Sequence, residues 1–211
     1  MNSSILYIIE GTLVTLEYTL ISVVLGFLIG TIIALCKISR AAMLQYFASA
    51  YISIFRGTPL LVQLSIIYYV LPQIGFNLSV FGAGIIAFSL NSSAYVAEII
   101  RGGINSIDKG QFESARALAI PYSLMMKDII LPQVFRNILP SLVNEVVNLL
   151  KETAIISVIG GRDIMKRTQE VTAQSYTYFE PLITAAICYY VLVLVFSSIA
   201  KYIEMKMKIK S

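Results

Sequence analysis

Residues 113–132, ESARALAIPYSLMMKDIILP, form a polar insert in a chain that is otherwise rich in apolar residues. Pro121 and Pro132 cannot donate backbone hydrogen bonds, and each disfavours helical geometry at the residue before it. The sequence therefore predicts one short helix that ends before Pro121 and a second from about Tyr122 to Ile130. Two such helices at an angle would form a knob that a groove on another protein could receive.

The composition of the chain excludes an ordinary soluble domain. Hydrophobic residues make up 57% of the 211 and charged residues only 13%, with a mean hydropathy of +0.79, whereas soluble domains are about one quarter charged. Histidine is absent, which removes the usual general base and argues against an enzyme or a histidine-bound metal site. Cys36 and Cys188 both lie in apolar runs, so we interpret them as small apolar residues. We expect an integral membrane protein that is not an enzyme.

Long uncharged runs define the expected membrane spans, since a helix needs about 20 apolar residues to cross a bilayer. Nineteen uncharged residues lie between Glu17 and Lys37, and 41 lie between Arg56 and Glu98. The longer run contains turn-forming residues at 72–77, which divide it into two spans. We predict an all-α polytopic membrane protein with about five transmembrane helices, at about 14–37, 47–71, 79–101, 139–161 and 181–204.

The positions of Lys and Arg test this count, because cytoplasmic loops carry an excess of positive charge. With five spans, eleven of the 16 Lys and Arg residues lie on the side of the C-terminus, and only Arg162, Lys166 and Arg167 lie on the other side. The bias predicts an N-terminus outside and a C-terminus in the cytoplasm. Charges interrupt the predicted span at 139–161. If this segment did not cross the membrane, the C-terminal cations would face outside, so the charge bias supports counting it as a span.

A single domain, 13–204, is expected to contain all five spans. The polar insert falls in a cytoplasmic loop at 102–136, between the third and fourth spans. A short extracytoplasmic N-terminus at 1–12 and a basic cytoplasmic tail at 205–211 flank the domain. The basic residues lie at helix ends beside anionic membrane lipid, so the positive net charge requires no nucleic-acid partner.

Charged residues inside a bilayer are costly, and each one needs a reason. In the segment 139–161, Asn148, Lys151 and Glu152 lie on a broad polar face at helical spacing. Such a face fits a helix that lines a water-accessible pathway, where Lys151 could bind the α-carboxylate of an amino acid and Glu152 its α-ammonium. The alternative is that these residues pair with one another inside the helix bundle.

Four further polar positions are candidates with different roles. Glu17, near the outer end of the first span, is a second acidic residue that could bind a cationic group. Asn91 and Ser92, midway along the third span, could line the pathway or bond neighbouring helices, and the sequence leaves both open. Glu98 and Arg101 are three residues apart near the cytoplasmic end, so we expect a structural ion pair.

The polar insert and three other segments together resemble the membrane subunit of a type I ABC importer. Five positions of the insert fit the family pattern Glu-Ala-Ala, three residues, Gly, nine residues, Ile, one residue, Leu-Pro: Glu113, Ala115, Ile129, Leu131 and Pro132. Ser114 replaces the first Ala, and Ala119 replaces the Gly. The other segments resemble the polar amino-acid branch, the histidine/glutamine-type permeases: RGTPLLVQL (56–64), NSSAYVAEIIRGGI (91–104) and KETAIISVIGG (151–161).

The resemblance implies a role for the insert as the loop that couples the permease to an ATPase. Glu113 would make the polar contact and Ala115 would allow close packing, within a coupling set of Glu113, Ser114, Ala115, Ala119, Ile129, Leu131 and Pro132. The family's Gly allows a positive φ that Ala does not adopt comfortably. We therefore expect Pro121 to supply the break in place of Ala119.

The resemblance also implies partners and a function. The chain would bind no cofactor itself, because ATP and Mg belong to a dimer of ABC ATPase subunits, and it lacks the Gly-x-x-x-x-Gly-Lys-Ser/Thr phosphate loop. An extracytoplasmic amino-acid-binding protein would deliver substrate at 162–180, and a second permease copy or a homologous permease would complete the pore. The expected function is import of a polar amino acid, glutamine first, across the bacterial inner membrane. The alternative is an ion-coupled secondary amino-acid transporter that uses Glu17 or Glu152.

Overall fold

The structure is a computed structural model that describes residues 2–208, and within this range it contains helices and no strand. Four helices are long: α1 (Asn2–Ile38), α4 (Val80–Asn105), α7 (Leu131–Glu152) and α9 (Phe179–Lys208). The short helices are α2 (Ala42–Gly57), α3 (Leu60–Ser65), α5 (Lys109–Ala117), α6 (Tyr122–Leu124) and α8 (Ile164–Ser175). Two π-helical turns (Ile66–Val70, Met125–Ile130) and two 3-10 helices (Leu71–Ile74, Thr153–Ile159) connect or extend them.

Three helices of the described residues are long and apolar enough to cross a membrane: Ser3–Ile38, Val80–Asn105 and Phe179–Ile203. A fourth crossing forms if Ala42–Gly57 and Leu60–Ile74, which are bent by 103° to each other, count as one span. α7 packs against α4, α9 and α1. Its 22 residues give a length of about 33 Å, which matches the hydrocarbon core, but its charges leave it outside the helices that are apolar enough to span a membrane. The predicted all-α polytopic membrane fold is confirmed.

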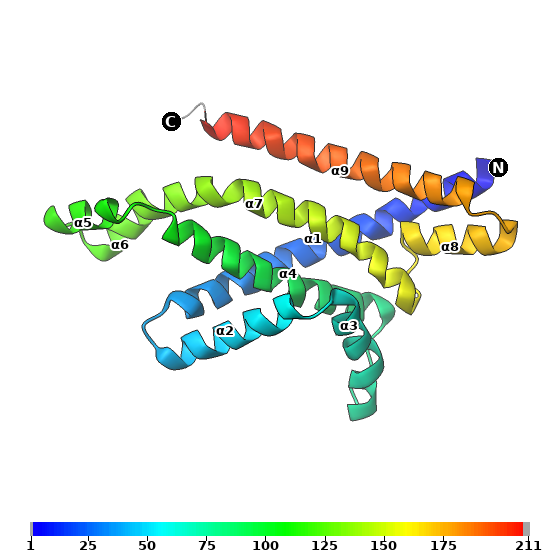
Figure 1. The fold of residues 1–211 in the computed structure, drawn as a ribbon, viewed down its shortest axis with the longest axis horizontal. Helices are drawn as coiled ribbons and strands as arrows, with labels where there is room; N and C mark the ends of the chain where they lie inside the picture. The colour runs from blue at the N-terminus through cyan, green and yellow to red at the C-terminus, as the bar shows by residue number, and fades with distance from the viewer. Residues whose placement is uncertain (1, 209–211) are drawn as a thin grey trace.

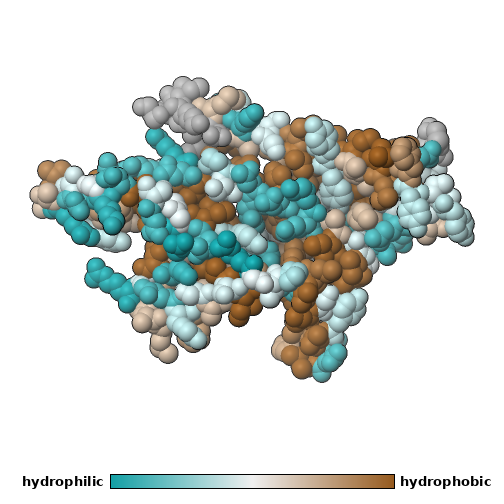
Figure 2. All heavy atoms as spheres, in the orientation of Figure 1, coloured by the Kyte–Doolittle hydropathy of each residue, from teal (hydrophilic) through white to brown (hydrophobic). Residues whose placement is uncertain are grey.

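The long helices run roughly along one axis, and the two ends of the molecule differ (Figure 1). The N-terminus and α8 lie at one end, whereas α5, α6 and the C-terminal end of α9 lie at the other. Figure 2 shows hydrophilic side chains at the α5–α6 end and in a band over α7, while α3 and α9 are mostly hydrophobic on this face.

The second predicted span, 47–71, is not one continuous helix. Thr58 has extended backbone angles, φ −120° and ψ 145°, and ends α2. Pro59 explains this conformation, because the residue before a proline is pushed out of the helical region. The chain leaves the bundle axis here, and α3 projects sideways (Figure 1).

Two side-chain amides satisfy the carbonyl groups that this break exposes. Gln63 Nε2 donates to the carbonyl oxygens of Phe55 (2.9 Å) and Thr58 (3.0 Å). Asn91 Nδ2 from α4 donates to the Phe55 carbonyl (3.2 Å) and to Gln63 Oε1 (3.0 Å). An unpaired backbone group costs several kcal/mol inside a membrane, so these amides make the break stable.

Helix ends differ from the expected bounds at several places. α1 is helical from Asn2, so the segment 1–12 continues the first helix as far as it is described. The fourth span begins at Leu131 rather than 139 and changes to a 3-10 helix after Glu152. The segment 162–180, expected to be a loop, contains α8. The expected basic tail, 205–211, lies partly outside the described residues.

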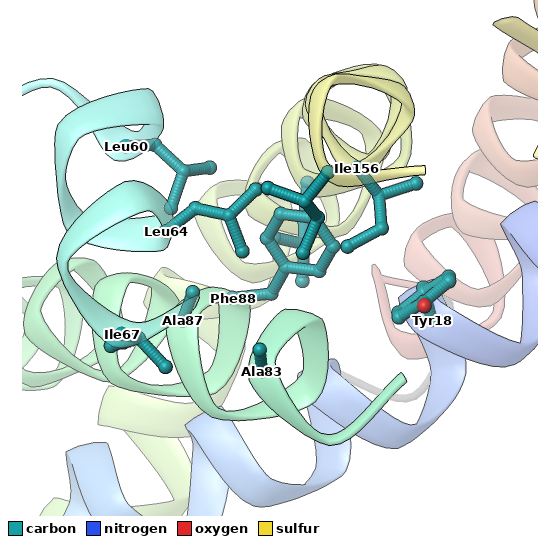
Figure 3. Packing of buried hydrophobic residues seen from close by; sticks show 10 residues of the cluster. Tyr18, Leu60, Leu64, Ile67, Ala83, Ala87, Phe88 and Ile156 are labelled. Carbon is teal, nitrogen blue, oxygen red and sulfur yellow. The ribbon is translucent and has the colours of Figure 1, made fainter. Parts of the chain in front are cut away.

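The main hydrophobic core lies where α1, α3, α4 and the 3-10 helix after α7 meet (Figure 3). Tyr18 and Phe88 are fully buried and form an edge-to-face pair with ring centroids 5.7 Å apart. Leu64 and Ile156 point toward them from α3 and the 3-10 helix. Gly30 lets α1 approach α4 closely, because a Cβ there would lie 2.7 Å from a backbone oxygen of α4. Such small-residue contacts are typical of membrane helix packing.

Candidate functional site

The polar insert folds into a knob, which we define as residues 107–132, at one end of the molecule. Asp108 caps α5 by accepting a hydrogen bond from the Gly110 amide (2.7 Å). At the other end of α5, the Ile120 amide donates to the Ala115 carbonyl (3.0 Å), and Ala119 has a positive φ of 54°. This is the Schellman arrangement of helix ends, which usually places glycine at the left-handed position.

Two expectations about the prolines in the knob therefore need correction. Ala119 itself takes the left-handed conformation that glycine has in the family pattern, and it turns the chain before Pro121 is reached. Pro132 does not break the second helix, which continues from Tyr122 into α7. A π-helical turn precedes Pro132, and the Leu131 amide there bonds to the carbonyl five residues back. The wider turn lets the helix continue past a residue that has no N–H.

The predicted coupling residues divide into an inner and an outer group. Ala115 is only 3% exposed and packs inside the knob with Met125 and Ile130. Ile129 is partly buried in the same cluster. The remaining predicted residues are exposed: Glu113, Ser114, Ala119, Leu131 and Pro132. The structure thus gives Ala115 a packing role inside the knob rather than a place on its surface.

Two exposed apolar residues on the knob were not among the sequence-predicted residues. Leu118 is 74% exposed and Tyr122 is 70% exposed, on either side of the turn at Ala119. These two side chains give the tip of the knob an apolar surface next to the polar Glu113 and Ser114. The signal in the sequence is a large apolar residue on each side of the helix break, which is where a knob has its tip.

α7 presents a polar face along its length. Asn144, Asn148, Lys151 and Glu152 are all exposed, and Figure 2 shows hydrophilic side chains over this helix. Among the described residues, none of these four makes a side-chain hydrogen bond or an ion pair that would satisfy it within the chain. Glu17 of α1 is likewise exposed. Polar side chains that are free of internal partners can bind water or a solute.

The polar residues of α4 have a different environment. Asn91 and Ser92 are buried, and Asn91 holds the break between α2 and α3. Ser92 donates to Glu145 Oε1 of α7 (2.8 Å). The hydroxyl thus joins α4 to α7 through Glu145, which lies on α7 one helical turn from Asn148.

Glu98 lies in a cluster of charges near the C-terminal end of α4. Arg101 donates to both of its carboxylate oxygens, at 3.0 and 2.8 Å. Arg56 at the end of α2 lies 3.7 Å from Glu98 and stacks over the Tyr95 ring at 5.3 Å. The pair Glu98–Arg101 is therefore a bidentate ion pair that also attracts α2.

At the opposite end, polar contacts attach α8 to α1. Arg167 donates to Glu10 Oε2 (2.7 Å) and to the carbonyl of Tyr7 (2.9 Å). The Tyr7 hydroxyl donates to Glu170, and this hydrogen bond holds the pKa of the Glu170 carboxyl below its usual value. Arg162 lies 3.4 Å from the same carboxylate. Among residues 2–208, no group of three or more acidic, histidine or cysteine side chains could hold a metal ion.

Asp163 at the start of α8 is fully buried. Its Oδ1 accepts from the Lys166 amide (2.8 Å) and its Oδ2 from the Tyr189 hydroxyl of α9 (2.9 Å). Burial raises the pKa of this carboxyl from 3.8 to about 6, because removing water disfavours the charged form.

Comparison with known proteins identifies the sequence family. The family described as the binding-protein-dependent transport system inner membrane component matches residues 23–209. The "Putative glutamine transport system permease protein" of Rickettsia typhi is 61% identical over 204 residues, which is 96% of this chain and 94% of that protein. The arginine transport system permease protein of Bacillus subtilis is 51% identical over 203 residues, 96% of this chain and 93% of that one.

Solved structures share the fold over nearly the whole chain. A chain from a crystal structure of an amino acid ABC transporter with histidines superimposes with a TM-score of 0.91 at 46% identity, covering 95% of this chain and 94% of that chain. An inward-facing methionine ABC transporter chain gives a TM-score of 0.81 at 19% identity, covering 95% and 96%. The second comparison supports the fold alone.

Proposed function

The chain belongs to the family of binding-protein-dependent transport system inner membrane components, and from this we propose that it is the permease subunit of an ATP-driven importer of polar amino acids. The observation that carries the proposal is family membership over residues 23–209 together with 61% and 51% identity to amino-acid permeases. The chain is then a membrane component rather than an enzyme. ATP and Mg would be bound by the partner ATPase subunits.

In this proposal the knob is the docking element for the ATPase and faces the cytoplasm. Glu113 and Ser114 offer polar contacts, and Leu118 and Tyr122 offer apolar side chains for a groove on the partner. The excess of Lys and Arg in the loops at this end supports a cytoplasmic location by the positive-inside rule. The N-terminus and α8 are then outside, where a binding protein would dock on residues 162–180.

The polar face of α7 would line the translocation pathway. Lys151 has a cationic group for an α-carboxylate, and Glu152 has an anionic group for an α-ammonium. A second permease copy or a homologous permease would cover this face, since a single chain leaves it open to lipid. Ser92 and Glu145 stand beside the pathway, and Glu17 supplies a further carboxylate on α1. Asn91 serves the helix break rather than the substrate.

Glutamine is the first candidate substrate, because the Rickettsia typhi relative carries that name, and arginine is the second. Both molecules carry the α-carboxylate and α-ammonium that Lys151 and Glu152 would bind. The ion-coupled transporter is the alternative function, but none of the relatives and structures described above favours it. The exposed apolar tip of the knob would also have no role in such a protein.

Uptake in proteoliposomes tests the proposal. The chain would be reconstituted with its ATPase and binding protein, and uptake of labelled glutamine and arginine would be measured with ATP inside. We expect uptake that needs both ATP and the binding protein and that a Glu113→Lys variant loses together with ATPase co-purification. Uptake that persists without ATP and follows an ion gradient would instead establish the alternative.

A further inference from the structure

Asp163 is a buried carboxylate at the point where α8, α9 and α1 meet. One oxygen accepts the Lys166 amide and so caps α8, and the other accepts the Tyr189 hydroxyl of α9. None of the described salt bridges includes it: the neighbouring Arg162 and Arg167 bind Glu170 and Glu10. The charge of Asp163 is therefore stabilised by hydrogen bonds alone, although the side chain is 0% exposed.

The choice of aspartate at this site is informative because a cap alone does not require it. Asn caps helices as well as Asp does, and it would avoid the cost of burying a charge. An ionised carboxylate, however, accepts hydrogen bonds at both oxygens, whereas Asn has one accepting atom. Asp163 can thus receive the α8 amide and the Tyr189 hydroxyl together, and this holds α9 to α8.

The third helix, α1, is fixed to the same point by close backbone packing. A Cβ on Gly11 would lie 2.7 to 2.8 Å from backbone atoms of Asp163 and Ile164. Beyond this contact, Arg167 binds Glu10, and its guanidinium lies 4.6 Å from the centre of the Tyr7 ring. These contacts hold α8 against α1, so the two helices cannot move separately at this point.

We propose that Asp163 is a positioning residue that makes α8 and the outer ends of α1 and α9 move as one body, so that docking of the binding protein on α8 is transmitted to the membrane helices. This rests on the proposed function, in which α8 faces the binding protein. Binding energy at α8 can change the tilt of α1 and α9 directly when the three elements are rigidly joined. The bond between Asp163 and Tyr189 supplies the connection to α9.

The test separates transmission from simple stabilisation. Tyr189→Phe removes the hydroxyl that binds Asp163 and leaves the α8 cap intact. Tyr190→Phe is the matched control, because Tyr190 is the next residue, is exposed, and makes no side-chain hydrogen bond within the described residues. The permease–ATPase complex in proteoliposomes would be assayed for ATP hydrolysis without binding protein and with saturating, glutamine-loaded or arginine-loaded binding protein.

We expect Tyr189→Phe to lower the ratio of stimulated to basal hydrolysis by about fivefold or more, a range typical of coupling between two sites. Basal hydrolysis and the Tyr190→Phe control should stay at the wild-type level. If Tyr189→Phe assembles poorly, Asp163→Ser serves instead, since its single hydroxyl can cap α8 but leaves no second oxygen for Tyr189, and it should lower the same ratio. If Tyr189→Phe assembles well, adding it to Asp163→Ser should lower the ratio little further, because both act on one bond.

Two results would overturn the inference. A ratio that is unchanged, or a parallel fall of basal and stimulated rates, would reduce Asp163 to a structural residue. A wild-type complex that no amino-acid-binding protein stimulates would overturn the proposed function, and the inference with it. The two failures are distinguishable because the second appears in the wild type and the first only in the variants.

Discussion

The helices α4 and α7 both carry polar residues within the bundle, yet they handle them in opposite ways. On α4, Asn91 and Ser92 are buried and hydrogen-bonded to other helices. On α7, Asn148, Lys151 and Glu152 are exposed and have no internal partner among the described residues. The difference teaches that a polar residue in a membrane helix is structural where the protein satisfies it, and a candidate for function where the protein does not.

The largest effect is expected at Glu152. Glu152→Gln should lower amino-acid uptake by about 10-fold to 100-fold, the range expected for losing a hydrogen bond to a charged group. The thermal stability of the purified permease should stay unchanged, because Glu152 is exposed and unpaired. Val158→Ala is a control at another exposed site on the following 3-10 helix. Normal uptake by the Glu152→Gln variant would contradict the proposal that the polar face of α7 binds substrate.

Asp163 is buried and hydrogen-bonded like the α4 residues, but it is charged, and this predicts a dependence on pH. Its pKa is raised to about 6, so the folded protein holds the proton more tightly than the unfolded chain does. The contribution of Asp163 to stability is therefore largest below about pH 4 and is lost as the pH rises through 6, by at most about 3 kcal/mol. The apparent melting temperature of wild type, relative to Asp163→Asn, should rise when pH falls from 7 to 5.

The comparison with Asp163→Asn is needed because a neighbour titrates in the opposite sense. The pKa of Glu170 is lowered by its hydrogen bond from Tyr7, so its contribution is present above about pH 4.5 and is lost at lower pH. Both proteins contain Glu170, and its effect cancels in the difference. A difference that is constant from pH 5 to pH 7 would contradict the raised pKa of Asp163.

The structural role of the buried polar residues on α4 is tested at Asn91. Asn91→Leu should destabilise the protein by about 2 kcal/mol, because it leaves the Phe55 carbonyl with one donor fewer and the Gln63 oxygen with none. Thermal unfolding in detergent measures this. Asn148→Leu is the matched change on α7, and we expect it to lower uptake without lowering the melting temperature. Equal destabilisation by Asn91→Leu and Asn148→Leu would contradict the assignment of a structural role to α4 and a functional role to α7.

An exposed apolar residue of the knob can be tested in the same way as the exposed polar residues of α7. Leu118 is exposed in a polar loop, so Leu118→Ala should weaken ATPase binding by about 1 to 2 kcal/mol, or roughly tenfold. Titration of the purified ATPase against the permease would measure the change. Met43→Ala replaces an equally exposed residue of α2 outside the knob and should bind normally. An unchanged affinity for Leu118→Ala would exclude the tip from the docking surface.

Features that depend on neighbouring residues in the sequence were predicted. Features that depend on contacts between residues far apart in the sequence were not. Uncharged runs predicted the apolar helices, and Pro121 within the polar insert predicted two short helices that form a knob. Thr58-Pro59 was visible as a motif, but the 103° bend depends on Gln63 and on Asn91, 28 residues further along the chain. Asp163 could be recognised as a possible helix cap, whereas its bond to Tyr189 exists only in the folded bundle.

The backbone conformation of Ala119 was likewise not predictable from the sequence. A substitution there is expected to give the smallest change in stability among these predictions. The expected break at Pro121 was reasonable, because alanine rarely takes a positive φ, yet the hydrogen bond from Ile120 to Ala115 holds Ala119 at 54°. Ala119→Gly should therefore stabilise the permease by about 1 kcal/mol and raise its melting temperature by roughly 2 to 4 °C. Ala117→Gly makes the same change at the last residue of α5, which has no positive φ, so glycine there should destabilise by up to about 0.5 kcal/mol. Opposite signs for the two variants would establish that the backbone at Ala119 is strained, whereas equal losses would mean that the turn does not need a left-handed residue.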